Sequence, residues 1–62
     1  MIDLKNLRKS ADHMSQTELA QLANVNRTTI SFIENGRIVP SVKVAKKIAD
    51  VFGIDWKVFY ND

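Results

Sequence analysis

Four side chains between positions 27 and 32 share one face of a predicted helix and carry polar or aromatic tips. Arg27 and Thr28 stand at its start, and Ser31 and Phe32 follow one turn later. Arginine can donate two hydrogen bonds to O6 and N7 of guanine, and a threonine methyl group can pack on the methyl group of thymine. We therefore expect these four side chains to contact DNA bases. Two alternatives stay open, in which Arg27 binds a phosphate and Phe32 leans back onto Lys43 and the helix that follows.

Two short helices and a tight turn are predicted to position this face. Ser15 and Glu18 have the spacing of a capping box, in which the two side chains each satisfy a backbone N–H at a helix start. Asn24 suits a left-handed turn, because asparagine tolerates a positive φ better than most residues do. Asn26 is then the expected cap of the second helix. Residues 15–35 are thus predicted to form a helix pair whose second member is free to enter a DNA groove.

Three further helices are predicted around this pair. The first covers residues 3–11, where apolar side chains recur at helical spacing. Another begins with Ser41 as its cap and ends at Gly53, because glycine favours the left-handed conformation that terminates a helix. A last short helix follows Asp55. The expected fold is all-α, with five helices in one domain over residues 1–62.

The composition excludes several classes of function. The chain of 62 residues has no cysteine, and its single histidine, His13, has no second ligand at metal spacing, so we expect no metal and no other cofactor. No nucleophile is paired with a base, so an enzyme is not expected. The chain has no room for a ligand-sensing domain, so we expect no small-molecule ligand. Its formal net charge of +2 supports a nucleic-acid partner only weakly.

The hydrophobic pattern gives an expectation for the location of the protein. Its apolar segments are too short and too charged to span a membrane. The first residues include an aspartate at position 3 and no long apolar run, so no targeting peptide is recognised. We therefore expect a cytoplasmic protein without a membrane partner.

A series of features occurs in the order found in one known family: Leu7-Arg8, Ser15-Gln16, Glu18-Leu19-Ala20, apolar residues at 25, 30 and 33, Glu34-Asn35-Gly36-Arg37, Pro40-Ser41, Ile48-Ala49 and Gly53-Ile54. With these features the sequence resembles the helix-turn-helix family of phage repressors and Cro, also called Xre-like regulators, from about Leu4 to Phe59. The resemblance implies a λ-repressor-like domain, with the motif at about 16–35. Two departures are visible: Asn24 replaces the commoner glycine of the turn, and the segment before Ser15 is one residue longer, with Asp12-His13 where glycine is typical.

The resemblance also implies roles for residues around the recognition helix, residues 27–34. In the family an arginine and a glutamate at the positions of Arg8 and Glu34 form an ion pair that positions this helix. The small residue that lets the two motif helices approach is Ala20. We expect phosphate contacts from five polar residues, Gln16, Asn26, Asn35, Arg37 and Lys43. For two of them a structural reading stays open, since Gln16 can be a plain helix-start residue and Lys43 can belong to a solvated lysine face.

The C-terminal residues supply aromatic and apolar surface that a short helix does not need for itself. In the family this region commonly forms a two-fold dimer interface, for which the candidates are Trp56, Val58, Phe59 and Tyr60. The alternative is that Trp56 and Phe59 complete the core, and Tyr60 and Val58 are then the better interface residues.

These observations predict a transcription regulator that binds a specific sequence in double-stranded DNA. The favoured form is a repressor that binds a palindromic operator as a homodimer, because one helix reads only a few base pairs. The alternative is a protein-interaction module, such as an antitoxin or an anti-repressor, that keeps the fold with weak or no specific DNA binding.

Overall fold

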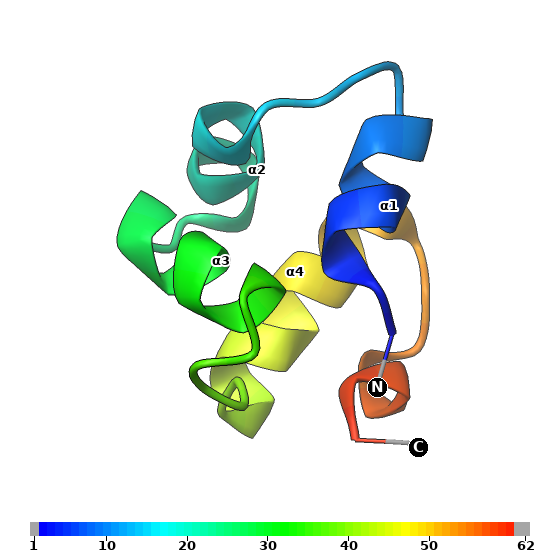
Figure 1. Cartoon of the computed structure of the whole chain (residues 1–62). Helices are drawn as coiled ribbons and strands as arrows, with labels where there is room; N and C mark the ends of the chain where they lie inside the picture. The colour runs from blue at the N-terminus through cyan, green and yellow to red at the C-terminus, as the bar shows by residue number, and fades with distance from the viewer. Residues whose placement is uncertain (1, 61–62) are drawn as a thin grey trace.

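The computed structural model describes residues 2–60. Over this range the chain forms helices and no strand, in the order α1 (Leu4–Ser10), α2 (Gln16–Ala23), α3 (Arg27–Glu34), α4 (Val42–Phe52) and the 3-10 helix η1 (Trp56–Phe59). The predicted all-α class is confirmed, and the expected fifth helix is the single 3-10 turn η1. Figure 1 shows α2 and α3 together on one side of the molecule and α1 with η1 on the other.

The helix boundaries follow the capping residues of the sequence. Both halves of the Ser15–Glu18 capping box are formed, with distances of 3.0 Å from the Glu18 nitrogen to Ser15 Oγ and 3.3 Å from the Ser15 nitrogen to Glu18 Oε1. The side chains of Asn26, Ser41 and Asp55 cap α3, α4 and η1 in the same way. The predicted starts of these helices are therefore confirmed. They could be predicted because each cap is a local interaction.

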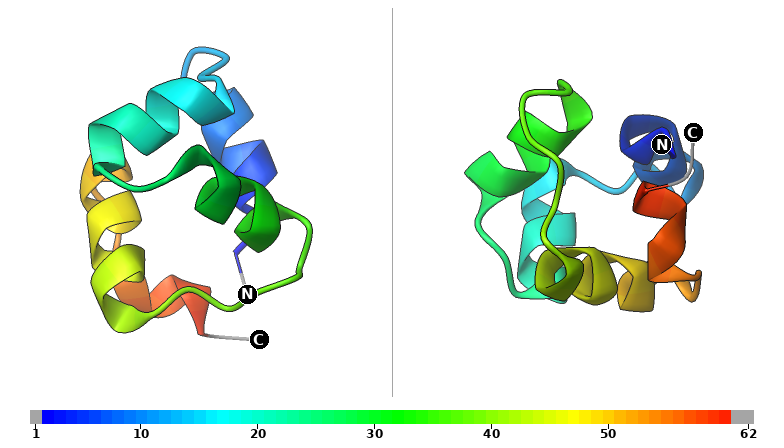
Figure 2. Two further views of the ribbon diagram at one scale, coloured as in Figure 1. Left: turned by 90° about the vertical axis from the view of Figure 1, so that its left-hand side faces the viewer. Right: turned by 90° about the horizontal axis from the view of Figure 1, so that it is seen from below.

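The turn between α2 and α3 is left-handed, as predicted. Asn24 has φ 56° and ψ 47°, and its N–H points back to the last turn of α2, where the carbonyl groups of Ala20 and Gln21 accept it. The N–H of Val25 also reaches the carbonyl of Ala20, at 2.9 Å. This tight turn sends α3 across the front of the molecule in the left view of Figure 2.

The helices enclose one apolar core whose largest fully buried side chains are Phe59, Leu19, Ile30, Ile33 and Ile48. α2 packs against both α3 and α4, and α4 packs against η1. Ala20 and Ala23 are buried on α2, where their small side chains let the neighbouring helices approach. The core therefore fixes α3 in place from its buried side only.

The longer segment before α2 adopts an unusual backbone conformation. Asp12 and His13 both have positive φ angles, 58° and 56°, in the region where glycine is most at ease. The turn leads to Met14, which is partly buried and packs against the core. Two consecutive left-handed residues thus accommodate the extra residue and stand where the family typically has a glycine.

Candidate nucleic-acid interface

The sequence of α3 divides its surface into a buried side and an exposed side. The buried side consists of Ile30 and Ile33. The side chain of Asn26 accepts a hydrogen bond from the Thr28 N–H at 2.8 Å and fixes the first turn. The other side brings together the four candidate base-contacting residues, Arg27, Thr28, Ser31 and Phe32. Ser31 is half-buried, and the other three are exposed.

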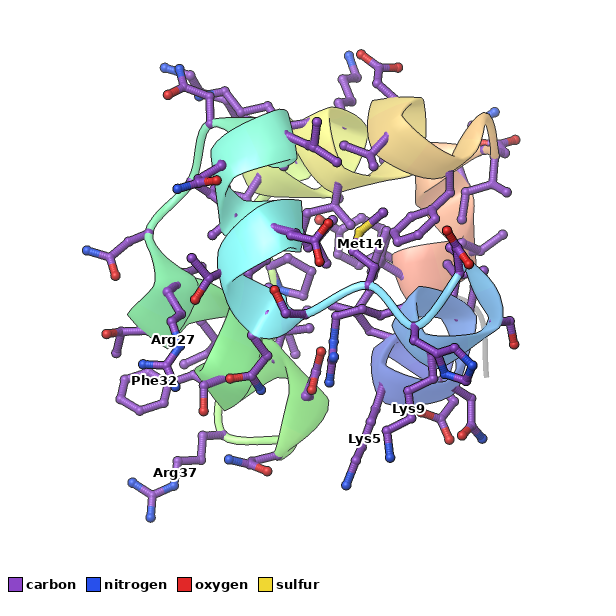
Figure 3. The ribbon with its side chains drawn as sticks, turned by 90° about the horizontal axis from the view of Figure 1, so that it is seen from above. Lys5, Lys9, Met14, Arg27, Phe32 and Arg37 are labelled. Carbon is purple, nitrogen blue, oxygen red and sulfur yellow. The ribbon has the colours of Figure 1, made fainter. Side chains whose placement is uncertain are left out.

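Phe32 lies beside an arginine from the loop after α3. The guanidinium carbon of Arg37 is 5.8 Å from the centroid of the Phe32 ring, and the Arg37 N–H donates to the Phe32 carbonyl at 2.9 Å. The ring remains 37% exposed. Figure 3 shows Arg27, Phe32 and Arg37 on the same side of the molecule. The guanidinium group of Arg37 thus covers part of the Phe32 ring. This contact keeps both side chains on the candidate interface.

The expected ion pair between α1 and the end of α3 is present. Arg8 Nε lies 2.7 Å from Glu34 Oε2 and Arg8 Nη2 lies 3.0 Å from Glu34 Oε1, so the contact is bidentate. The two side chains are only 10% and 3% exposed. Arg8 Nη1 also donates to the Met14 carbonyl at 2.7 Å, and Gln16 Nε2 donates to Glu34 Oε1 at 3.0 Å. One carboxylate thus joins α1, the start of α2 and the end of α3.

The charged state of this pair is favoured by its surroundings. Burial of the Glu34 carboxylate opposes ionisation, but hydrogen bonds from Arg8 and Gln16 and the positive charges of Arg8 and Lys5 outweigh it, so the pKa of Glu34 lies below its ordinary value. The hydrogen bond to Glu34 likewise raises the pKa of Arg8 against the effect of burial. At neutral pH the bridge is therefore a true ion pair.

The five candidate phosphate-contacting residues differ in what they already bind. The side chain of Gln16 is bound to Glu34, and that of Asn26 caps α3. Asn35 ends α3 and reaches Ser31 Oγ only at 3.5 Å. Arg37 lies over the Phe32 ring, as described above. Lys43 is exposed at the second position of α4, and among residues 2–60 no hydrogen bond or ion pair joins it to α3.

In the C-terminal turn, one of the four candidate dimer-interface residues, Phe59, is buried in the core. Phe59 is only 1% exposed and belongs to the core, because η1 folds it back against α4. Its side chain is therefore not available to a partner. Trp56 and Val58 are half-buried, and Tyr60 is exposed with its ring edge against Trp56 at 5.9 Å between centroids. The hydroxyl of Tyr60 donates to the Pro40 carbonyl, which ties the turn to the loop before α4.

Two partners of the Arg8–Glu34 pair are not predicted by the sequence. They are the Gln16 side chain, which we expect at a phosphate, and the carbonyl of Met14. The residue types carry no signal for either contact, because Gln16 and Glu34 are 18 positions apart and meet only when α2 and α3 pack. The capping residues, in contrast, lie within three positions of their partners.

Two helices joined by a left-handed turn, with the polar face of the second exposed, define a helix-turn-helix unit of the nucleic-acid-binding class. A family model described as helix-turn-helix matches residues 4–59. The chain therefore belongs to the helix-turn-helix family, and the resemblance noted in the sequence is confirmed.

Several curated proteins are similar to this chain. An uncharacterized HTH-type transcriptional regulator, YqaF of Bacillus subtilis, is 44% identical over 48 residues, which cover 77% of this chain and 63% of the relative. The ImmF control region 10 kDa protein of Bacillus phage phi105 is 42% identical over 55 residues, covering 89% and 60%. An uncharacterized HTH-type transcriptional regulator of Archaeoglobus fulgidus is 52% identical over 40 residues, covering 64% and 56%. The chain thus spans roughly three fifths of the length of these relatives.

No solved structure matches the chain significantly. Within residues 2–60, no helix has both the length and the apolar character that crossing a membrane requires. In the same range, no three histidine, aspartate or glutamate side chains gather as metal ligands would.

Proposed function

We propose that residues 1–62 act as a single domain that binds a specific sequence in double-stranded DNA and regulates transcription. The observation that carries the proposal is the exposed polar face of α3, on a helix whose end is anchored by a buried, bidentate ion pair. Rigid support matters because base recognition requires side chains held in register with the groove. The names of the relatives as transcriptional regulators support the same reading.

In this proposal α3 lies in the major groove and reads bases from its leading end. Arg27 donates to guanine, Thr28 and Ser31 offer hydroxyl groups, and the exposed edge of the Phe32 ring packs on a thymine methyl group. Arg37 holds the ring from its other side and directs its charge to a phosphate. Asn35 lies beside it at the end of α3 and contacts the same strand.

Phosphates on the opposite side of the groove meet the start of α2. The first turn of a helix has N–H groups without intrahelical partners and a positive dipole end, both of which favour an anion. Gln16 stands at the first position of α2, next to the Ser15 cap. Asn26 and Lys43 complete the proposed set, at the start of α3 and of α4.

We propose that the regulator works as a homodimer on a palindromic operator and represses by occupying a promoter. An exposed apolar surface is available for self-association on the α3–α4 loop and the start of α4, formed by Ile38, Val39 and Val42. Tyr60, whose hydroxyl donates to Pro40 in that loop and whose ring edge meets Trp56, extends it to the C-terminal turn, where Val58 is half-buried. In this arrangement η1 takes the place of the fifth helix of the phage-repressor fold.

Selection from random duplex DNA at physiological salt tests the proposal. We expect enrichment of a two-fold symmetric motif with half-sites about 10 base pairs apart, centre to centre. Binding that is weak, equal for all sequences and lost as salt rises would refute sequence-specific recognition and favour a protein partner instead.

Two arginine variants then separate base contacts from phosphate contacts. Arg27→Ala should cost about 1–3 kcal/mol on the selected site and relax one base position. Arg37→Ala should weaken binding to all sequences alike and reduce the salt slope by about one for each protomer bound. If both variants act equally on every sequence, Arg27 does not read a base.

A further inference from the structure

α1 carries two lysines that the helix-turn-helix motif does not include. Lys5 and Lys9 are four positions apart, which places them on one face of α1, and both are exposed. Arg8 lies beside them on the buried side and connects α1 to the end of α3 through Glu34. Figure 3 shows the side chains of Lys5 and Lys9 extending from α1 toward the same edge of the molecule as Arg37.

The charge of Lys5 is felt at the end of α3. Its positive charge is among the causes that lower the pKa of Glu34, the last residue of α3. Within residues 2–60 the sole ion pair is that between Arg8 and Glu34, so neither lysine is neutralised by an acidic side chain in contact with it. α1 therefore presents unpaired positive charge near the end of α3.

We infer that Lys5 and Lys9 bind backbone phosphates in the DNA that flanks the base pairs read by α3. They add phosphate contacts to those proposed at the starts of α2, α3 and α4 and at the Asn35–Arg37 loop. The Arg8–Glu34 pair holds α1 at a fixed position relative to α3, so lysines on α1 meet the duplex in a defined register. The inference rests on the proposed DNA binding and extends its footprint beyond the motif.

Long and short duplexes distinguish this role from that of ordinary solvated lysines. The selected operator is prepared once with blunt ends at the outer edges of its half-sites and once with about five more base pairs on each side. Binding of the wild-type chain, Lys5→Gln, Lys9→Gln and the double variant is measured as a function of KCl concentration. Lys57→Gln is the matched control, because Lys57 is an exposed lysine on η1, away from α3 (Figure 1).

On the long duplex we expect each α1 substitution to reduce the salt slope by about 0.9 per protomer, the value for one phosphate contact on B-DNA, and thus by about 1.8 for the bound homodimer. The preference among operator sequences should remain unchanged, and Lys57→Gln should bind like the wild type. On the short duplex the α1 variants and the wild type should bind alike, because the flanking phosphates are missing. Thermal unfolding of each variant shows whether the fold is intact.

Several outcomes overturn the inference. Salt slopes of the α1 variants equal to that of Lys57→Gln on the long duplex would show that the lysines are merely solvated. An equal loss on both duplexes would place their contacts inside the operator. If an operator is selected and Arg27→Ala relaxes it while the α1 variants have no effect, only the inference fails. If no duplex binds, the proposed function fails with it.

Discussion

Replacing Arg8 with methionine tests how the end of α3 is held. The substitution keeps much of the side chain's length and apolar surface but removes three hydrogen bonds: two to Glu34, at 2.7 and 3.0 Å, and one to the Met14 carbonyl at 2.7 Å. It leaves the Glu34 carboxylate, whose side chain is only 3% exposed, with Gln16 as its remaining hydrogen-bond donor. The main cost is therefore the uncompensated buried charge.

The expected loss of stability is about 3 kcal/mol, the lower end of the range for removing one partner of a buried pair, because Gln16 still donates to Glu34. A domain of this size is stable by about 3–9 kcal/mol in total. The variant should thus unfold at a temperature lower by roughly 12–24 °C, or be largely unfolded at room temperature. Urea unfolding followed by circular dichroism and by the fluorescence of Trp56 measures the change.

A double variant shows whether charge or packing is responsible. Arg8→Met combined with Glu34→Met removes both ions and fills the site with apolar atoms, so we expect it to regain about 2 kcal/mol of the loss. The reasoning is refuted if Arg8→Met costs less than about 1 kcal/mol. It is also refuted if the double variant is less stable than the single variant, because packing around the arginine would then outweigh its charge.

Three further substitutions test other parts of the structure. The pKa of Glu34 is lower in the folded chain than its ordinary value of 4.5, so its stabilising effect should be complete above about pH 4.5 and be lost as the pH falls through the folded pKa. Glu34→Gln should remove this part of the pH dependence of urea unfolding. Ala20→Leu should cost about 1–3 kcal/mol of stability by overpacking the contact of α2 with its neighbours, as urea unfolding would show. Its affinity for the selected operator should fall as well. His13→Gly should raise stability by about 0.5–1 kcal/mol, because glycine relieves the positive φ of 56°; a lower unfolding temperature would contradict this.

The sequence predicts the helix starts well because their causes are local. The capping box joins Ser15 and Glu18, three positions apart, and Asn24 accepts a left-handed turn through its own side-chain preference. The first helix begins after its cap Asp3, as expected, but it ends at Ser10, before the predicted residue 11, because Ala11 has left the helical conformation. Local chemistry therefore determines where a helix begins better than where it ends.

The contacts between distant residues could not be predicted from spacing or residue type. Phe59 has the composition of an interface residue, but the turn at Gly53 and the short η1 direct it into the core. The contact of Arg37 with Phe32 depends on the path of the loop after α3. Arg8 and Glu34 were paired by resemblance to a family, since 26 positions separate them and many charged residues in the chain are equally plausible partners on composition alone.

The start of α2 divides phosphate binding and the orientation of α3 between its backbone and the side chain of Gln16. Its carboxamide donates to Glu34, and a carboxamide that turned toward a phosphate would give up this bond to a buried carboxylate, which is worth about 1.5–3 kcal/mol. The backbone N–H groups at the start of α2 could bind a phosphate without this cost. Ser15 Oγ accepts the N–H of Glu18, and among the hydrogen bonds of residues 2–60 none uses the N–H groups of Gln16 and Thr17. In the proposed complex the backbone at the start of α2 therefore binds the phosphate, while the Gln16 side chain keeps the end of α3 in register.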